Sequence, residues 1–518
     1  MKWKRCNKNM NNRLGNVIRG VATGVINKFV AIIFPLLIRM VFVKTIGIKY
    51  LGLNGLFGSI LGVLGITELG VSSAIVYSLY RPLADNDITR VNALLKLLRK
   101  IYNYVGIIIC VISLALVPFL HYLVADTSEV DINLRVLYLV FLFNTVIGYF
   151  LYSYKVSLLI ALQRTDINNI VSTVILLAEY VLQVFVLIMI GNYYIFVIIM
   201  PVATICNNLI VSYYVNKQYP QYHCEGKLER SEVKEIFKKV GALAGNKING
   251  TLVNSADNLV LSAFLGVTVV ALYQNYYTVI GALVAFMALL FDSLRPSIGN
   301  SLVTENTEKN YKDYNSITMI VAWIAGWCSI CLLCLFQSFI SFYYGKDYLL
   351  NLSTVILLAF YFYIWKILDV QVLYRDAAGL WWTDRFRPYI VSVCNLVTNI
   401  LLVKTIGING VIISTVGTQL VISLPWLITS LNKEYFNERI SKYLFNQVYY
   451  FVAIFISAIF TYFVCHFLIT RSDLAGFCMK MLACCVIPNI IIFLFFRRKE
   501  EFKKVQIIAS EFLYQKKD

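Results

Sequence analysis

Ionisable side chains lie inside long apolar segments of this sequence. Each would cost several kcal/mol at the centre of a membrane unless it faced water or a partner. The first such segment, residues 17–43, carries Arg19, Lys28 and Arg39, and Lys28 and Arg39 are eleven residues apart, so they share one helix face. Glu68 in the next segment lies at a depth similar to that of Lys28. Lys28 and Glu68 either form a structural ion pair or line a cavity, and both hypotheses stay open.

A second concentration of polar side chains lies in residues 239–265. This segment is too polar to face lipid, because amide and charged groups inside a membrane need polar surroundings. We therefore expect one face of it to line a polar lumen, formed by Asn246, Lys247, Asn249, Asn254 and Asp257.

Other charged residues are candidates for ion or proton coupling, or for charge pairing. Glu179 stands alone in its segment, as a cation or proton site or as a protonated, hydrogen-bonded carboxyl. Lys366 and Asp369 have the i, i+3 spacing of an intrahelical pair, for which a structural and a functional role are equally open. Asp292 is a candidate partner of Lys247. The coupling or pairing set is Glu68, Glu179, Asp257, Asp292, Lys366 and Asp369.

The intramembrane cations predict a substrate-binding cavity with net positive charge. Such a cavity suits an anionic substrate, because Arg and Lys bind phosphates well. Basic residues near the segment ends are instead expected to extend to the membrane surface. These are Arg135, Lys155, Arg295, Arg375 and Lys480.

Catalytic and metal-binding patterns are weak. The three histidines are scattered, and the D-x-D at Asp85 is a short pattern that is common by chance. The twelve cysteines lie mostly in apolar segments, so Cys331-x-x-Cys334 is interpreted as small packing residues. We expect no enzyme activity, no catalytic residues, no metal and no cofactor.

The composition predicts the elements that position these residues. The chain has 518 residues, 59% of them hydrophobic and 14% charged. Its apolar runs have the length of about 20 residues that a membrane-spanning helix needs. The chain is therefore predicted to be an all-α polytopic membrane protein with about 14 transmembrane helices. The predicted spans are 17–43, 51–80, 101–124, 135–160, 169–190, 194–216, 239–265, 270–294, 317–343, 351–376, 389–403, 410–430, 448–469 and 477–496.

Basic residues are distributed unevenly between the two sets of connecting segments. The set that includes both termini holds 31 Lys and Arg residues, and the other set holds five. Cytoplasmic connections carry such an excess. Both termini are therefore predicted to be cytoplasmic, and the +18 net charge does not indicate a nucleic-acid partner.

An internal repeat relates the two halves. Gly20-x-x-x-Gly24 matches Gly241-x-x-x-Gly245, and Gly191 matches Gly407 by its distance from a later Asn-Lys-x-Tyr. The turn at Ile46-Gly47 likewise matches Leu265-Gly266. Two pseudo-symmetric six-helix bundles are expected, with a substrate site between the halves. The predicted parts are 1–220 (first bundle), 235–433 (second bundle), 448–496 (two further helices) and 497–518 (basic cytoplasmic tail).

Three sequence motifs resemble one transporter family. Residues 46–57 (IGIKYLGLNGLF), 67–74 (TELGVSSA) and 79–85 (LYRPLAD) are similar to the Wzx-type polysaccharide flippases of the multidrug/oligosaccharidyl-lipid/polysaccharide exporter superfamily. The resemblance is strongest over residues 13–105.

The resemblance implies a flippase of a bacterial inner membrane, with Arg19, Lys28 and Lys247 on the cavity-facing helices. Its substrate would be an undecaprenyl-pyrophosphate-linked oligosaccharide for capsule, exopolysaccharide or other cell-surface polysaccharide, translocated by alternating access. Its partners would be membrane lipids and the polymerase and glycosyltransferases of the same pathway. We expect the protein to be a monomer.

Two alternatives remain open. A drug or metabolite exporter of the same superfamily would share the fold but use an acidic cavity. A polysaccharide polymerase would need catalytic residues in sizeable outer loops, and the longest predicted outer loop has only about ten residues, near Asp126–Asp131.

Overall fold

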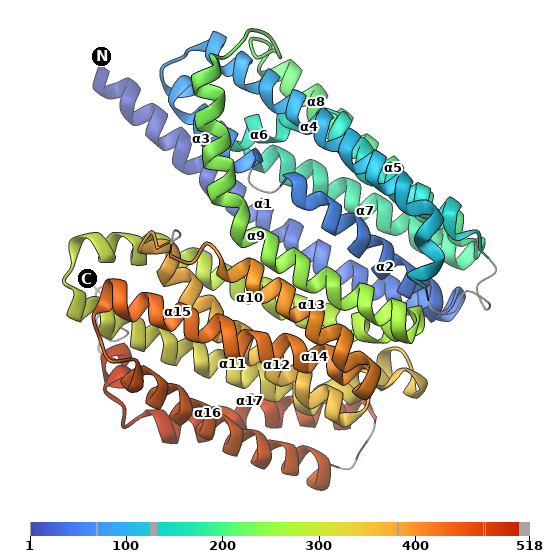
Figure 1. The fold of residues 1–518 in the computed structure, drawn as a ribbon, viewed down its shortest axis with the longest axis vertical. Helices are drawn as coiled ribbons and strands as arrows, with labels where there is room; N and C mark the ends of the chain where they lie inside the picture. The colour runs from blue at the N-terminus through green and yellow to red at the C-terminus, as the bar shows by residue number, and fades with distance from the viewer. Residues whose placement is uncertain are drawn as a thin grey trace. The chain divides into compact units, whose positions relative to one another are not determined.

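The computed structural model describes residues 2–68, 71–124, 132–380, 383–469, 471 and 473–506, which form helices joined by turns and loops (Figure 1). The side chains of 2–18, 67, 238–239, 241–249 and 254 are not described. The helices belong to two compact units, Met1–Ala271 and Leu272–Asp518.

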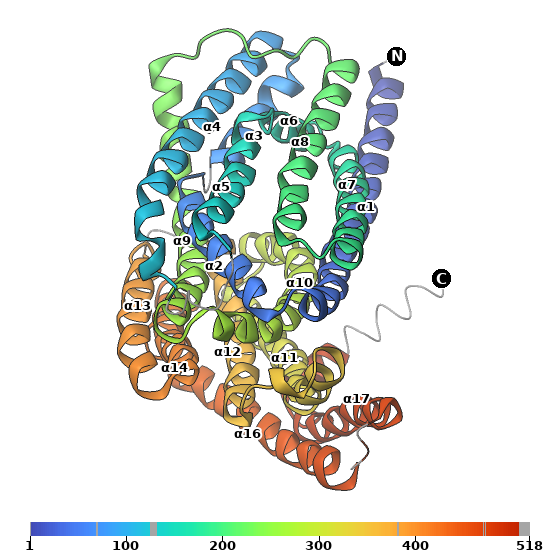
Figure 2. The ribbon, with the colours of Figure 1, turned by 90° about the vertical axis from the view of Figure 1, so that its right-hand side faces the viewer.

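In the first unit, the long helix α1 packs along α7, and Figure 2 shows the two side by side. A Cβ on Gly20 would lie 2.5 Å from Thr165 Oγ1, so the first Gly-x-x-x-Gly pair serves close helix packing. An apolar core joins α3, α4 and α6, where Leu79, Leu98 and Leu159 are fully buried. The elements are α1 (Lys2–Thr45), α2 (Ile48–Leu64), η1 (Gly65–Glu68), α3 (Val71–Ala84), α4 (Ile88–Leu116), η2 (Val117–Tyr122), α5 (Leu134–Phe150), α6 (Tyr154–Ala161), α7 (Thr165–Met189), α8 (Tyr193–Gln218) and α9 (Arg230–Leu265).

In the second unit, α11 and α12 are the central helices, with 61% and 67% of their most apolar stretches buried. The last two helices, α16 and α17, pack against α11 and against each other. The elements are α10 (Val267–Thr304, which begins in the first unit), α11 (Thr307–Tyr343), η3 (Lys346–Tyr348), α12 (Leu352–Ala377), α13 (Arg387–Ile406), α14 (Ile408–Thr418), η4 (Gln419–Ser423), α15 (Leu424–Leu431), η5 (Asn432–Phe436), α16 (Ile440–Phe463), η6 (Val464–Leu468) and α17 (Leu474–Phe496).

The two ends of α17 are fixed by different contacts. At its start, the Asp473 carboxylate accepts a hydrogen bond of 2.9 Å from the Gly476 N–H, which caps the helix and lowers the pKa of Asp473 below its usual value. Beyond its end, the ring of Phe502 stacks on Trp323 of α11 at 6.0 Å, and Lys504 Nζ lies 2.6 Å from Asp313 Oδ1. The described part of the basic tail therefore packs on the helices.

Eleven helices of the described chain are long and apolar enough to span a membrane, or twelve if α5 and α6 form one bent span. The protein is therefore a multi-pass membrane protein, and the predicted count of fourteen spans is not confirmed by the described residues. The predicted span 51–80 is divided by η1, and the span 135–160 bends by 50° between α5 and α6. The predicted span 239–265 lies within α9, whose side chains are only partly described.

Two of the glycine pairs matched by the internal repeat occupy similar turns. Gly47 (φ 105°) lies between α1 and α2, and Gly266 (φ 87°) lies between α9 and α10. Gly191 (φ 64°) precedes α8, and Gly407 (φ 59°) precedes α14. Glycine is favoured at a positive φ because it has no Cβ. The repeat read from sequence spacing thus corresponds to matching backbone conformations in the two halves.

Gly52 on α2 predicts a stability effect with a matched control. A Cβ at Gly52 would lie 1.9 Å from the Val267 carbonyl oxygen, so Gly52→Ala forces backbone apart and should cost about 1–3 kcal/mol. A thermal melt of the protein in detergent measures the loss. For Gly58, on the same helix, no atom of the described residues lies within 4 Å of a Cβ, and Gly58→Ala should leave the melt unchanged or raise it. Equal melting temperatures for the two variants would contradict the prediction.

Candidate functional site

Some polar groups of helix α1 contact α7, and some of its basic side chains are exposed. Asn27 Nδ2 donates to Thr173 Oγ1 at 3.0 Å, and Asn169 Nδ2 donates to the Gly20 carbonyl at 3.1 Å, so amides join α1 to α7. Arg19 and Lys28 are instead exposed, while Arg39 is half-buried. The Arg19 and Lys28 side chains thus remain exposed beside the α1–α7 contact.

Glu68 lies where the predicted second span is interrupted. Its carboxylate interacts with the hydroxyl groups of Tyr102 and Tyr149, next to the pair formed by Ser72 and Ser157 (Oγ–Oγ 3.0 Å). Lys28 is exposed, and within the described residues its ammonium has no ion-pair or hydrogen-bond partner. The structure therefore does not form a Lys28–Glu68 ion pair, which leaves Lys28 available to water or to a substrate.

Glu179 lies on α7, in the part of that helix that packs against α1. Its Oε1 accepts a hydrogen bond of 3.4 Å from Gln183 Nε2, one turn later on the same helix. The neighbouring Tyr180 ring stacks on Phe34 of α1 at 5.8 Å. Glu179 is partly buried, and its carboxylate is hydrogen-bonded within its own helix.

Helix α9 carries the second predicted polar set. The side chains of Asn246, Lys247, Asn249 and Asn254 lie outside the described part of the chain, so the predicted polar lumen on this face stays a prediction. Asp257 is 3% exposed and so does not lie on an open surface. The next residue, Asn258, makes a polar contact with α2, because its Nδ2 donates to Ser59 Oγ at 2.9 Å.

In the second unit, Lys366 and Asp369 form an intrahelical ion pair, with Lys366 Nζ 2.5 Å from Asp369 Oδ2. The Lys366 side chain is 2% exposed and the Asp369 side chain 31%. The ammonium also lies 4.5 Å from the centre of the Trp365 ring, a cation–π contact. Asp292 is exposed and lies 3.9 Å from Arg295 on its own helix.

Two of the basic residues expected at the membrane surface are buried. Lys155 is 6% exposed, and its Nζ donates to Ser212 Oγ and Asn216 Oδ1, each at 2.7 Å. Arg375 is 1% exposed and is paired with Asp384. The expectation that these two extend to the surface is therefore wrong, because polar partners on other segments replace water.

Arg375 belongs to a buried charge network that the sequence interpretation missed. Arg387 donates to both carboxylate oxygens of Asp384, from Nε at 2.6 Å and from Nη2 at 2.8 Å. Arg387 Nη1 also donates to Ser423 Oγ at 2.9 Å. Asp384 is fully buried, so one carboxylate holds two guanidinium groups at the turn between α12 and α13. The spacing Arg-x8-Asp-x2-Arg is the only signal in the sequence for this network.

An apolar pocket of about 570 Å³ lies within the second unit, between α11, α12 and α16. Its walls are aliphatic and aromatic, and they include Ile356, Phe360, Phe451, Phe455 and Ile459. None of its lining residues in the described part of the chain is charged. The pocket is therefore suited to a hydrocarbon chain.

Comparisons with known proteins identify the family. Residues 17–302 match the family described as "Polysaccharide biosynthesis protein", which is more than half of the chain. The chain belongs to this family of polysaccharide biosynthesis proteins, as the sequence motifs indicated. No curated protein sequence matches the chain.

Solved structures show the same fold. The lipid II flippase MurJ in an inward closed conformation has a TM-score of 0.67 at 16% identity, covering 91% of this chain and 98% of its own. An inward-facing multidrug resistance transporter of the MATE family has a TM-score of 0.62 at 13% identity, covering 77% and 93%. A MATE transporter of Vibrio cholerae has a TM-score of 0.52 at 15% identity, covering 83% and 98%. The chain thus has the transporter fold of the superfamily to which its motifs were assigned.

Proposed function

We propose that this protein is a flippase for undecaprenyl-pyrophosphate-linked oligosaccharides, used in the synthesis of a cell-surface polysaccharide. The family match supports polysaccharide synthesis, and the fold supports transport. The observation that carries the assignment of an anionic lipid is the exposed ammonium of Lys28 within the span Arg19–Thr45, for which the described side chains provide no ion-pair partner.

The depth of Lys28 gives this observation its weight. Nine residues separate Lys28 from Arg19, which is about 14 Å of helix, close to the middle of a hydrocarbon core about 30 Å thick. An ammonium at that depth is stable only where it faces water or a counter-charge. The phosphates of a lipid-linked sugar would provide such a counter-charge.

The lipid part of the substrate needs a different surface. A polyprenyl chain is hydrocarbon, so it can stay in the bilayer or enter an apolar pocket such as the one between α11, α12 and α16. The polar headgroup would then pass along the cationic side chains while the chain follows apolar walls. Rocking of the two halves would carry the headgroup across, and the membrane potential offers about 2.3 kcal/mol per charge and 100 mV to drive it.

The orientation belongs to the same proposal. Both termini lie on the cytoplasmic side of a bacterial inner membrane. The protein acts as a monomer beside the polymerase and glycosyltransferases of its pathway. A reporter enzyme that works only outside the cytoplasm, such as a phosphatase, should then be active when it is fused after Glu129, which lies outside the described residues. Activity of a cytoplasmic reporter at that position would reverse the orientation.

A reconstituted assay tests the function. Proteoliposomes containing the purified protein receive a fluorescent polyprenyl-pyrophosphate oligosaccharide, and a membrane-impermeant quencher reports how much is exposed outside. The protein should accelerate exchange of this lipid but not of the same labelled oligosaccharide on an uncharged polyprenyl ether. Transport of a cationic dye that depends on Asp257, with no lipid exchange, would instead establish a drug exporter.

A further inference from the structure

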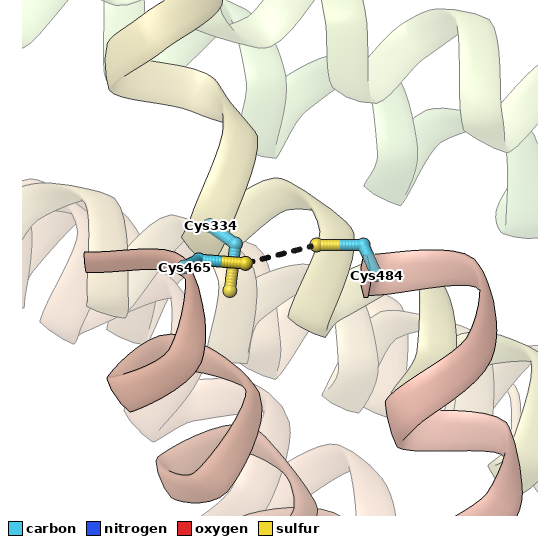
Figure 3. Close-up of side chains that lie close together, drawn as sticks. All are labelled: Cys334, Cys465 and Cys484. Atoms are coloured by element: carbon cyan, nitrogen blue, oxygen red, sulfur yellow. Dashed lines mark hydrogen bonds between the residues drawn. The ribbon is translucent and has the colours of Figure 1, made fainter. Parts of the chain in front are cut away.

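Three cysteine side chains from different helices meet inside the second unit. Cys334 is on α11, Cys465 is in η6 and Cys484 is on α17, and Figure 3 shows their sulfur atoms turned toward one another. All three Sγ atoms lie within 4.8 Å of one another, and the Cys465 and Cys484 sulfurs are 3.9 Å apart. The residues are 8%, 2% and 0% exposed.

These distances fit the first coordination shell of a thiophilic metal ion. Zinc–thiolate bonds of about 2.3 Å place the sulfurs about 3.8 Å apart around a tetrahedral ion and about 4.0 Å apart around a trigonal one. Small apolar packing would also bury cysteine. Packing does not require that three of only twelve cysteines converge from segments separated by 131 and 19 positions in the sequence.

The local backbone supports a built site. Cys465 lies in a π-helical turn, Val464–Leu468, which ends the regular helix α16. Such wide turns occur frequently at functional sites because they redirect a side chain from its regular position. This turn directs Cys465 toward α17, where its Sγ also lies 3.9 Å from the Lys480 carbonyl oxygen.

Charge and access are consistent with a divalent ion. Three thiolates around a divalent ion leave one negative charge, and the Lys480 ammonium interacts electrostatically with Cys465. A cavity of about 660 Å³ adjoins the cluster and is lined by both Cys334 and Cys465. Its other walls include His466, Arg471 and Lys480, so an ion has a polar route to the thiols.

We propose that Cys334, Cys465 and Cys484 bind a thiophilic divalent cation of the zinc and cadmium type. The ion would join α16 and α17, the two helices that follow the predicted second bundle, to the central helix α11. A metal ion that binds the folded protein and not the unfolded chain stabilises the fold by mass action. The Cys331 thiol of the C-x-x-C pair is not one of the three ligands, because its Sγ faces the Cys484 carbonyl at 4.0 Å.

Cadmium titration of the full-length protein in detergent, reduced with a phosphine, tests the proposal. We expect about one Cd²⁺ per chain, detected by the ultraviolet thiolate-to-cadmium charge-transfer band, and a rise in melting temperature with Cd²⁺ or Zn²⁺. Cys465→Ser and Cys484→Ser should weaken binding at least tenfold. Cys485→Ser is the matched control, because this exposed neighbour of Cys484 is not in the cluster.

Size-exclusion profiles of the serine variants establish that they remain folded. Binding in Cys465→Ser that equals that of the unchanged protein would overturn the proposal, as would the absence of the charge-transfer band in the unchanged protein. A Cys465–Cys484 disulfide in the isolated protein, combined with no cadmium binding after reduction, would also overturn it. Because the titration requires no transport, the outcome is independent of the flippase assay.

Discussion

Replacing Lys28 with alanine is expected to slow exchange of the pyrophosphate-linked lipid at least tenfold while leaving the amount of folded protein unchanged. A hydrogen bond to a charged group contributes about 1.5–3 kcal/mol, and about 1.4 kcal/mol corresponds to a factor of ten. The exposed Lys28 has no ion pair within the described residues, so its removal breaks no ion pair among them. It also removes a charge that the membrane disfavours.

Two further variants separate charge from position. Lys28→Arg keeps the charge and should retain most of the exchange rate. Lys44→Ala removes an exposed lysine from the last turn of the same helix and should have little effect. Full exchange in Lys28→Ala would disprove the role of Lys28, and an equal loss in Lys44→Ala would assign the effect to net charge alone. Lys247→Ala tests the corresponding residue that was identified from sequence on α9.

The helical class and most helix positions could be predicted from the sequence, because apolar runs of membrane length allow few other structures. The interruption at Gly65–Glu68 could not. Glu68 is the single charged residue in the sequence 51–80, and hydropathy does not distinguish a continuous span from two helices joined by a 3-10 turn. The hydroxyl groups that surround Glu68 come from α4 and α5, distant in the sequence.

The candidate site shows the same limit in its charges. Spacing identified the Lys366–Asp369 pair, since both residues lie on one helix. Lys155 and Arg375 were assigned to the membrane surface because each lies near a span end, but their partners come from other segments. The three-cysteine cluster was missed for a related reason: the visible C-x-x-C pair contributes one member, and the other two come from α17 and the turn after α16.

Glycine positions were more informative than charges in one respect. The repeat was recognised from spacing alone, and its paired glycines have matching positive φ angles in the two halves. A turn that requires a positive φ strongly favours glycine, so the residue type reports a backbone conformation directly. A charged side chain reports only that a partner or water is needed, without identifying either.

Asp384 gives the largest expected effect on stability. Asp384→Ala would leave the guanidinium groups of Arg375 and Arg387, 1% and 4% exposed, without the carboxylate that they share. Removal of one member of a buried ion pair costs about 3–5 kcal/mol, because Arg387 loses the carboxylate that it contacts, while Arg375 keeps Asp376, whose Oδ1 lies 2.8 Å from its Nη2. A unit of the size of Leu272–Asp518 shifts its melting temperature by about 2–4 °C per kcal/mol, so we expect the melting temperature of this unit to fall by roughly 10 °C. Thermal denaturation of the purified protein in detergent, followed by tryptophan fluorescence, measures it.

The control for this prediction is a carboxylate in an exposed ion pair. Asp85 lies 3.8 Å from Arg81, with side chains 65% and 93% exposed, so Asp85→Ala should cost less than about 1 kcal/mol. Asp384→Asn keeps the volume of the side chain and removes only its charge. If the asparagine variant melts with the unchanged protein while the alanine variant does not, packing volume and not charge holds the α12–α13 turn. If the asparagine variant also loses most of the stability, the shared carboxylate is what allows two arginines to be buried there.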